Sequence, residues 1–194
     1  MLKAVMLNSK KPISYDDLVV QARTQNQALG ELYDRFHDQI YRFCRYRLYT
    51  TEAAEDVTSE IFLNVARKIP TFRGETEQEF RRWLYAVAAN QANAYIRKTK
   101  RRHELFTAAV RTAESPPNIN LHNQPAVDWD TLHQALKQLK PRHQNIIILR
   151  FVEDFSHEQI AAILSLKPVT VRVGLNRALK KLRKILQTSF DGDR

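Results

Sequence analysis

Two adjacent helix patterns separated by a short break mark the C-terminal part of this chain. Ser156, with Gln159 three residues later, forms a capping-box pattern that predicts where the first helix begins. Pro168 is compatible with the first turn of the second helix. Both segments carry an apolar stripe at helical spacing, so the two helices can pack together. The stripes are Ile160, Ile163 and Leu164 on the first, and Val171, Leu175, Ala178 and Leu182 on the second. The pattern predicts a helix-turn-helix.

The second of these helices leaves a basic, hydrogen-bonding surface on its outer side. Helix-turn-helix proteins place such a surface in the DNA major groove. The outward residues are Lys167, Thr170, Arg172, Asn176, Arg177, Lys180, Lys181 and Lys184. The whole chain has 31 Lys and Arg residues against 21 Asp and Glu, a net charge of +10, which favours polyanions as partners. Nucleic acid is therefore the expected class of partner.

The rest of the chain also follows helical spacing. It has only four glycines, and no stretch alternates apolar and polar residues as a surface strand does. Ser14 with Asp17 predicts a cap for a first short helix, and apolar stripes predict three more, the third ending at Pro70 and the fourth running from about Gln78 into a basic segment. The stripes are Leu29, Leu32, Phe36, Ile40 and Phe43, then Val57, Ile61, Val65 and Ile69, then Phe80, Trp83, Leu84, Val87 and Ile96.

We therefore expect an all-α protein with two small helical domains joined by a flexible linker. The linker is predicted where Ser115-Pro116-Pro117, several asparagines and Pro125 replace any apolar stripe. At that length it should let the two domains take separate positions. The predicted division is an N-terminal extension at 1–13, a first domain at 14–106, the linker at 107–128, a second domain at 129–188 and a tail at 189–194.

Several classes of function are disfavoured by composition. The longest apolar runs, such as Ile146 to Leu149, fall far short of the ~20 residues that span a bilayer, and residues 1–12 lack a secretory apolar core, so we expect a cytoplasmic protein. The single cysteine, Cys44, excludes an intramolecular disulfide and a multi-cysteine zinc site, and it is predicted to lie in the core. The six histidines lack metal-ligand spacing, and no Gly-rich phosphate loop occurs. We predict no metal, no cofactor and no enzyme site.

Three segments in order resemble a known family. Residues 54–62 read Ala-Glu-Asp-Val-Thr-Ser-Glu-Ile-Phe, residues 80–90 lead into a basic run, and residues 139–151 precede the helix-turn-helix. Together they are similar to the sigma factors of bacterial RNA polymerase, and specifically to the compact extracytoplasmic-function (ECF) group. The resemblance implies a sigma region 2 four-helix domain followed by a sigma region 4 helix-turn-helix domain. The linker is too short for the intermediate domain of larger sigma factors, which also favours the compact group.

The first segment resembles the family's polymerase-binding helix. Without the resemblance, its carboxylates favour a solvated face near a helix N-terminus. With it, they imply contacts to core RNA polymerase, although Ser59 stands where many members have glutamine. The predicted core-polymerase-binding residues are Glu55, Asp56, Ser59, Glu60 and Phe62.

The second segment resembles the helix that family members use on the −10 promoter element. Basic residues there also suit a solvated helix end, but the asparagines suit base edges. The predicted −10 residues are Arg82, Tyr85, Asn90, Asn93, Arg97, Lys100 and Arg101. The loop from Thr71 to Glu77 is the candidate wall of a pocket for turned-out bases, and Phe72 and Tyr85 could stack on bases or belong to the core.

The predicted second helix of the helix-turn-helix resembles the family's reader of the −35 element. The predicted −35 residues are Lys167, Thr170, Arg172, Val173, Asn176, Arg177 and Lys180. Lys167 replaces a frequent serine cap, and Val173 and Gly174 stand where many members have serine and arginine. Glycine inside a helix costs ~1 kcal/mol relative to alanine. Either the backbone at Gly174 approaches another element closely, or this helix reads an unlike promoter.

The resemblance implies core RNA polymerase and promoter DNA as partners, together with an anti-sigma factor, and neither membrane insertion nor a small-molecule substrate. One alternative is a stand-alone transcriptional regulator in which residues 14–102 sense a signal or dimerise. Another is a DNA-processing enzyme such as a recombinase, for which the sequence offers no nucleophile set among clustered arginines.

Overall fold

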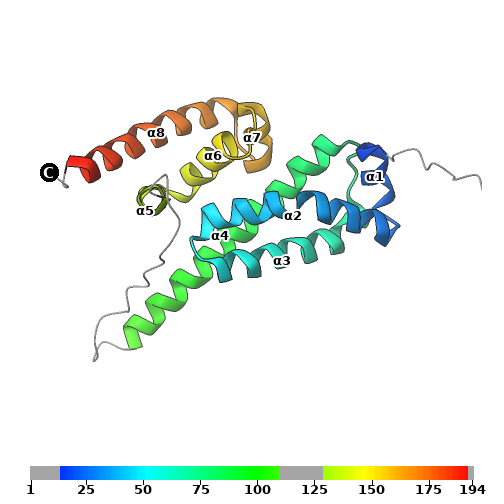
Figure 1. The fold of residues 1–194 in the computed structure, drawn as a ribbon, viewed down its shortest axis with the longest axis horizontal. Coiled ribbons are helices and arrows are strands. Elements are labelled where there is room, and N and C mark those ends of the chain that lie inside the picture. Colours follow the sequence, from blue (N-terminus) through cyan, green and yellow to red (C-terminus); the bar gives the residue numbers. More distant parts are fainter. Residues whose placement is uncertain (1–13, 110–128, 192–194) are drawn as a thin grey trace, which may run out of the picture.

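The computed structural model describes residues 14–109 and 129–191, and within these ranges every regular element is helical. This agrees with the predicted all-α class. Figure 1 shows the helices in chain order. They are α1 (Tyr15–Gln21), α2 (Asn26–Leu48), α3 (Thr51–Lys68), the short 3-10 helix η1 (Ile69–Thr71), α4 (Glu77–Ala109), α5 (Trp129–Lys137), α6 (Pro141–Phe151), α7 (His157–Leu164) and α8 (Pro168–Asp191).

The first four α-helices form the N-terminal domain. The Ser14 hydroxyl accepts a hydrogen bond from the backbone N–H of Asp17 at 3.1 Å, which confirms the predicted cap of α1. Thr50 caps α3 in the same way, at 3.3 Å from the N–H of Ala53. The predicted stripes of α2, α3 and α4 meet in one core, whose fully enclosed members include Leu32, Phe36, Ile40, Ile61, Phe80 and Leu84.

The C-terminal domain contains α5 to α8 and confirms the helix-turn-helix. Ser156 accepts from the N–H of Gln159 at 3.2 Å, and the Gln159 side chain accepts from the N–H of Ser156 at 2.8 Å. Ser165 ends α7 in a left-handed conformation, with φ at 54°, and Pro168 opens α8. The predicted stripes of α7 and α8 face each other, with Ile160 and Val171 completely buried.

Two predicted boundaries fall inside helices. Helix α4 continues to Ala109, three residues beyond the predicted domain end at 106, and α8 continues to Asp191, beyond the predicted end at 188. Neither extension contains proline or glycine, so nothing local stops the helix there. Residues 110–128, which hold the rest of the predicted linker, and the predicted extension at 1–13 lie outside the described residues.

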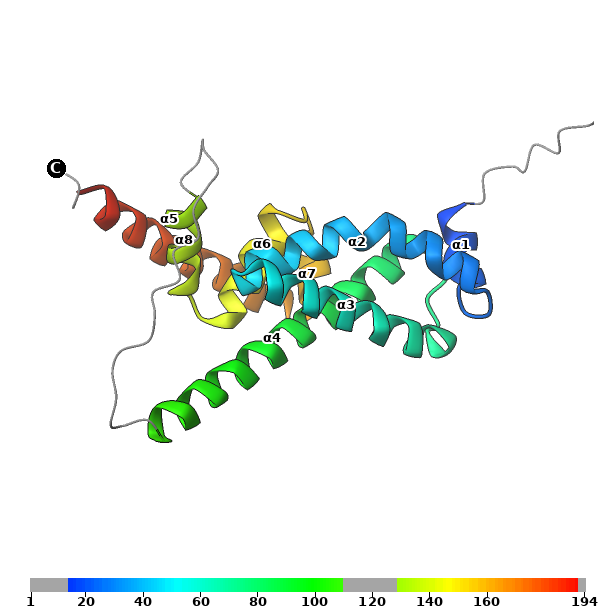
Figure 2. The ribbon, with the colours of Figure 1, turned by 60° about the horizontal axis from the view of Figure 1, so that its bottom comes forward.

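The two domains pack against each other. Helices α6 and α7 lie along α2 and α4, as the views in Figures 1 and 2 both show. The second half of α4 projects beyond this packed region. The sequence led us to expect domains in separate positions, whereas the structure brings them together through buried polar side chains.

Candidate functional site

The outer face of α8 is open to solvent. Of the predicted −35 residues, Thr170 is half-buried and the others are exposed: Lys167, Arg172, Val173, Asn176, Arg177 and Lys180. Lys181, which the sequence placed on the same outer face, instead donates from Nζ to the carbonyl of Gln138 at 2.6 Å. This contact ties α8 to the end of α5. The exposed face is cationic and carries hydrogen-bonding side chains, which suits a DNA groove.

Gly174 is buried on the opposite side of α8, where this helix meets α6. A Cβ added there would lie 2.8 Å from Cδ1 of Ile146 and 3.8 Å from Cδ2 of His143. Such a distance to Ile146 is shorter than real Cβ contacts allow. The first of the two explanations for Gly174 is therefore supported, because its backbone approaches another helix closely.

Helix α4 exposes part of the predicted −10 face. Arg82 is half-buried, while Asn90, Arg97, Lys100 and Arg101 are exposed. Arg97, Lys100 and Arg101 lie on the second half of α4, which projects from the packed region in Figure 2. Lys100 forms an ion pair with Glu104 one turn later, at 3.6 Å and well exposed. Such a pair contributes little to stability, so Lys100 is free to exchange it for a phosphate.

Tyr85 and Asn93, the other two predicted −10 residues, form hydrogen bonds with other parts of the protein. The Tyr85 ring is fully buried and lies 4.9 Å from the Phe155 ring, centroid to centroid. Its hydroxyl donates to the carboxylate of Glu153, and burial, together with that carboxylate, raises the pKa of Tyr85. The Asn93 side-chain oxygen accepts from Nη2 of Arg47 at 2.7 Å. Tyr85 is therefore closed to DNA in this arrangement, whereas Asn93 is half-buried.

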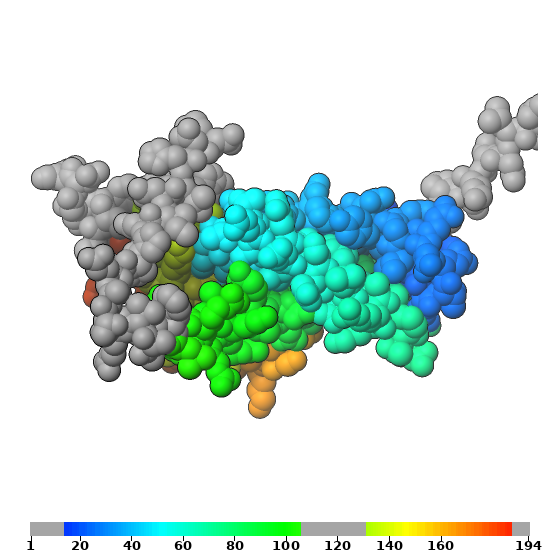
Figure 3. Space-filling view, turned by 90° about the horizontal axis from the view of Figure 1, so that it is seen from below, coloured from blue at the N-terminus to red at the C-terminus, as the bar shows by residue number. Residues whose placement is uncertain are grey.

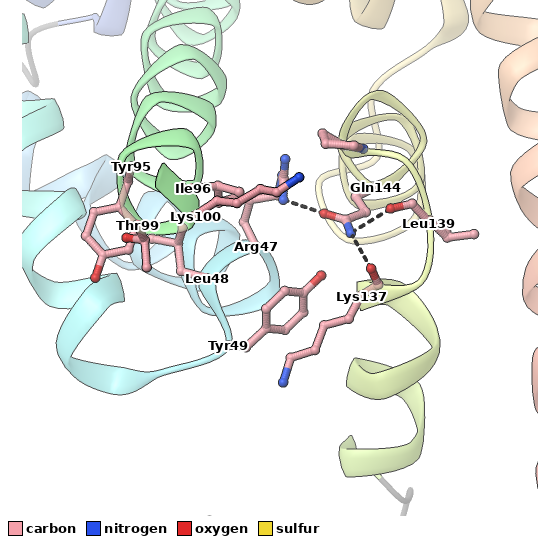
Figure 4. A pocket seen from close by; sticks show the side chains of 11 residues that line it. Arg47, Leu48, Tyr49, Tyr95, Ile96, Thr99, Lys100, Lys137, Leu139 and Gln144 are labelled. Carbon is pink, nitrogen blue, oxygen red and sulfur yellow. Dashed lines mark hydrogen bonds between the residues drawn. The ribbon is translucent and has the colours of Figure 1, made fainter. Parts of the chain in front are cut away.

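Arg47 joins three helices through a set of hydrogen bonds that we call the Arg47 cluster: Arg47, Asn93, Gln144 and Asn145. The arginine is 1% exposed, and its Nε donates to Oδ1 of Asn145 at 2.6 Å while Nη1 donates to Oε1 of Gln144. Burial lowers the pKa of Arg47 to about 10. The cation is thus held by neutral amide oxygens from α4 and α6, beside a cavity of about 410 Å³ (Figure 4).

Glu153 anchors a second set, the Glu153 cluster: Arg42, Arg81, Tyr85 and Glu153. The Glu153 side chain is fully buried, and its carboxylate accepts from Nη2 and Nε of Arg42 at 3.2 and 3.3 Å. This hydrogen bonding is the main cause that raises the pKa of Arg42. Arg81 donates from Nη2 to the backbone carbonyl of Glu153 at 2.7 Å, and its guanidinium lies 4.2 Å above the Phe155 ring.

The sequence did not lead us to predict a role for Arg47 or Glu153. Arg47 does carry a signal, because it continues the apolar stripe of Phe36, Ile40 and Phe43 at helical spacing, where a charge indicates a buried partner. Glu153 carries none, since it stands in a short turn next to the exposed Asp154.

The predicted polymerase-binding face of α3 is accessible. Glu55, Asp56, Ser59 and Glu60 are exposed, and Phe62 is half-buried. The Phe62 ring meets the exposed Tyr33 of α2 edge-on at 4.7 Å between centroids. Helix α3 lies uncovered on the face shown in Figure 3. Acidic and aromatic groups therefore lie side by side, which suits a protein partner.

The loop before α4, residues 72–76, is held in place by aromatic stacking and by hydrogen bonds. Phe72 stacks on Trp83 with ring centroids 4.8 Å apart, and Arg23 donates from Nη2 to the carbonyl of Gly74 at 2.6 Å. The Glu79 carboxylate accepts from two backbone N–H groups of the loop, and these hydrogen bonds lower the pKa of Glu79. Phe72 is therefore engaged with the domain itself.

Within the described ranges, no group of three or more His, Cys, Asp or Glu residues is placed to hold a metal ion. No helix of that part is long and apolar enough to cross a membrane. Cys44 is buried as expected, and burial raises the pKa of its thiol to about 11, so it is unreactive.

Comparison with known families and proteins gives matches along the chain. Residues 32–102 match the model of sigma-70 region 2, and residues 129–182 match that of sigma-70 region 4. The RNA polymerase sigma-H factor of Pseudomonas aeruginosa is 30% identical over 177 residues, covering 85% of this chain and 89% of that protein. The ECF RNA polymerase sigma factor BldN of Streptomyces coelicolor is 29% identical over 178 residues, covering 88% of this chain but only 65% of that longer relative.

A solved structure shares the fold. It is the sigma factor RpoE of Bartonella quintana in complex with the anti-sigma factor NepR, with a TM-score of 0.66 and 20% identity, covering 81% of this chain and 96% of that one.

Proposed function

This chain belongs to the sigma-70 family of RNA polymerase sigma factors, in its ECF group, and on that premise we propose that it binds core RNA polymerase, recognises −10 and −35 promoter elements and directs initiation at a specific set of promoters. One observation carries the proposal: regions 2 and 4 both match, in order, and each has a basic helix face at the position where the family reads DNA. A stand-alone regulator has no need of a region 2.

Each surface has a role in this proposal. The exposed carboxylates of α3, with Phe62, bind the polymerase. The basic residues of α8 bind −35 phosphates, each adding about 0.9 to the slope of log affinity against log salt, while Asn176 can read a base edge. The asparagines and cations of α4 bind the −10 strand. The sigma factor supplies no catalysis and needs no cofactor, because polymerase makes the RNA.

The likeness to a sigma factor bound to its anti-sigma factor supports an anti-sigma partner for this chain. A protein that works with polymerase and promoter DNA acts in the cytoplasm, where the bacterial chromosome lies.

The proposal is tested by mixing the protein with core polymerase and a promoter library, then sequencing the transcripts. New start sites that share two upstream elements are expected. Specific duplex binding by the protein alone, with no core binding and no new start sites, would instead favour the regulator.

Asp56→Ala tests the polymerase face. Because Asp56 is exposed on α3, its loss should weaken core binding about tenfold while leaving the melting temperature nearly unchanged. Glu31→Ala, an exposed carboxylate on α2, is the control and should leave core binding intact. A melted N-terminal domain in the Asp56 variant would show that this residue is structural.

A further inference from the structure

Two exposed valines lie at the centre of the outward face of α8. This helix packs on α5, α6 and α7 and runs along the outer edge of the molecule in Figure 1. Val169 and Val173 are 62% and 44% exposed, and their spacing of four residues places them on successive turns of one face. Ala178, nine residues after Val169 and therefore on the opposite side of the helix, is completely buried. The valines thus point away from the core of the domain.

Helix stability does not account for valine at these two positions. Valine is β-branched, and it is a poorer helix former than the Lys, Arg, Glu and Gln residues that suit exposed helix positions. A single exposed apolar side chain would need no explanation. Here, however, two stand on adjacent turns, and the exposed side chains one turn away from them are polar: Arg172, Asn176 and Arg177. An apolar pair with a polar rim is typical of a contact surface.

The charges around the valines indicate what covers them. Arg172 and Arg177 lie on either side of the pair around the helix axis, and α8 has no acidic residue before Asp191 at its end. Duplex DNA offers phosphates to both flanks and, in its major groove, one apolar group, the C5-methyl of thymine. The valines lie in the first two turns of α8, the part of a recognition helix that contacts base edges.

We propose that Val169 and Val173 contact C5-methyl groups of thymine, so that this chain selects −35 elements with A·T pairs at the positions that the two side chains face. The inference deepens the proposed function and rests on it for placing the contact at −35. Four residues advance about 6 Å along a helix and base pairs are about 3.4 Å apart, so the two thymines should lie within about two base pairs of each other. Asn176, one turn after Val173, can hydrogen-bond an adenine edge in the same stretch.

Replacement of thymine by uracil tests the contact, because it removes the methyl group and keeps the base pairing. Holoenzyme made with the full chain first selects promoter duplexes from a random library, and each thymine of the shared −35 element is then replaced singly by deoxyuridine. Loss of one buried methyl contact should weaken binding about fourfold. We expect this loss at one or two neighbouring thymines. Equal binding of every uracil duplex, or an element without thymine, would overturn the proposal.

Substitutions in the protein assign each methyl group to a side chain. Val169→Ser and Val173→Ser remove both methyl groups of the valine at nearly the same helix propensity. Each variant should bind the thymine duplex several-fold more weakly and should no longer distinguish thymine from uracil at one position. Val20→Ser, at an exposed valine of α1, is the control and should keep the full preference for thymine. A fourfold preference that persists in both α8 variants would show that other residues contact the methyl groups, and the proposal would be wrong.

The thymine contact and the proposed function can fail separately. If holoenzyme produces new start sites but its −35 element tolerates every uracil, only the thymine contact is wrong. If core polymerase is not bound and the protein alone selects a duplex, the proposed function fails, while the uracil series on that duplex still decides whether the valines contact thymine. If neither the holoenzyme nor the free protein selects any duplex, both are overturned.

Discussion

The two predicted DNA-reading faces differ in how far they are available. On α8 the cationic face is exposed along its length, and the helix is fixed by contacts on its other sides, such as Gly174 against Ile146. On α4 two of the predicted readers are engaged by other helices or turns: Tyr85 by Glu153 of the C-terminal domain, and Asn93 by Arg47 of α2. Basic and amide side chains are thus exposed to solvent on α8, whereas some of the predicted readers on α4 are hydrogen-bonded within the protein. The predicted −35 face is therefore exposed, whereas the predicted −10 face is partly covered.

The two regions differ in the burial of their charged side chains. The cations of the α8 face are solvated, so their removal should change DNA affinity and little else. Arg47 and Glu153 are enclosed, so the amides and the phenol around them depend on their presence. Substitutions of the exposed cations should therefore change the affinity for DNA, whereas substitutions of the buried charges should change the free energy of unfolding.

Arg47→Ala should have the largest effect on stability. It leaves the side-chain amides of Asn93, Gln144 and Asn145 without their common donor, in a site that is 1% exposed at the arginine. We expect a loss of about 2–4 kcal/mol in the free energy of unfolding of the protein, measured with urea. Arg45→Ala is the control, since Arg45 bonds an exposed Thr51 hydroxyl, and it should cost less than about 0.5 kcal/mol. Equal losses would show that Arg47 contributes no more than a surface arginine.

Asn93→Ala and Asn90→Ala compare a hydrogen-bonded asparagine of α4 with an exposed one on the same helix. Asn93 accepts from Arg47, so its loss should destabilise the protein by about 1–2 kcal/mol. Asn90 is exposed, so its loss should leave stability unchanged and weaken binding of the −10 strand by about 1–3 kcal/mol if it reads a base. Urea unfolding and strand-binding titrations with holoenzyme check the two expectations. If Asn90→Ala binds the strand normally, the asparagine has no reading role.

Gly174→Ala and Gly30→Ala test whether the close packing of α8 against Ile146 requires glycine. A Cβ at Gly30 of α2 meets nothing within 4 Å, so this substitution should stabilise the protein by about 0.5–1 kcal/mol through helix propensity. At Gly174 the new Cβ would force Ile146 to move within a closely packed site, which should cancel that gain or reverse it. Thermal unfolding of both variants measures the difference. Equal stabilisation would mean that Ile146 moves freely and that glycine is not needed for packing.

Local signals predicted much of this fold. The side chain of Ser14 or Ser156 reveals a helix start because its hydrogen-bond partner lies three residues away, and Pro168 can only open a helix at that point. The apolar stripes likewise placed Ile160 and Val171 in the core. Such features need no knowledge of distant residues.

The engagement of the −10 face could not be found in the same way. Arg47 and Asn145 are 98 positions apart, and nothing near Glu153 marks it as buried. The basic spacing along α4 is compatible with a free face or a covered one. Only the packing of α6 and α7 on α2 and α4 decides between these, and packing between domains leaves no periodic pattern in either segment.

The smallest expected effect concerns His143, which lies beneath α8 near Gly174. Burial, followed by the charges of Lys140, Arg177 and other nearby cations, lowers the pKa of His143 below its ordinary value of 6.5. The unfolded chain then binds more protons than the folded one between the two pKa values, so stability is full above about pH 7.5 and declines as the pH falls through 6.5. The His143 side chain is only partly buried, so the change should be less than that of the glycine pair. Urea unfolding at about pH 7.5 and about pH 5.5 should show a smaller pH dependence in His143→Gln than in the wild type. An unchanged dependence would assign it to other groups, and a larger one would mean that the protonated imidazole gains a partner beneath the recognition helix.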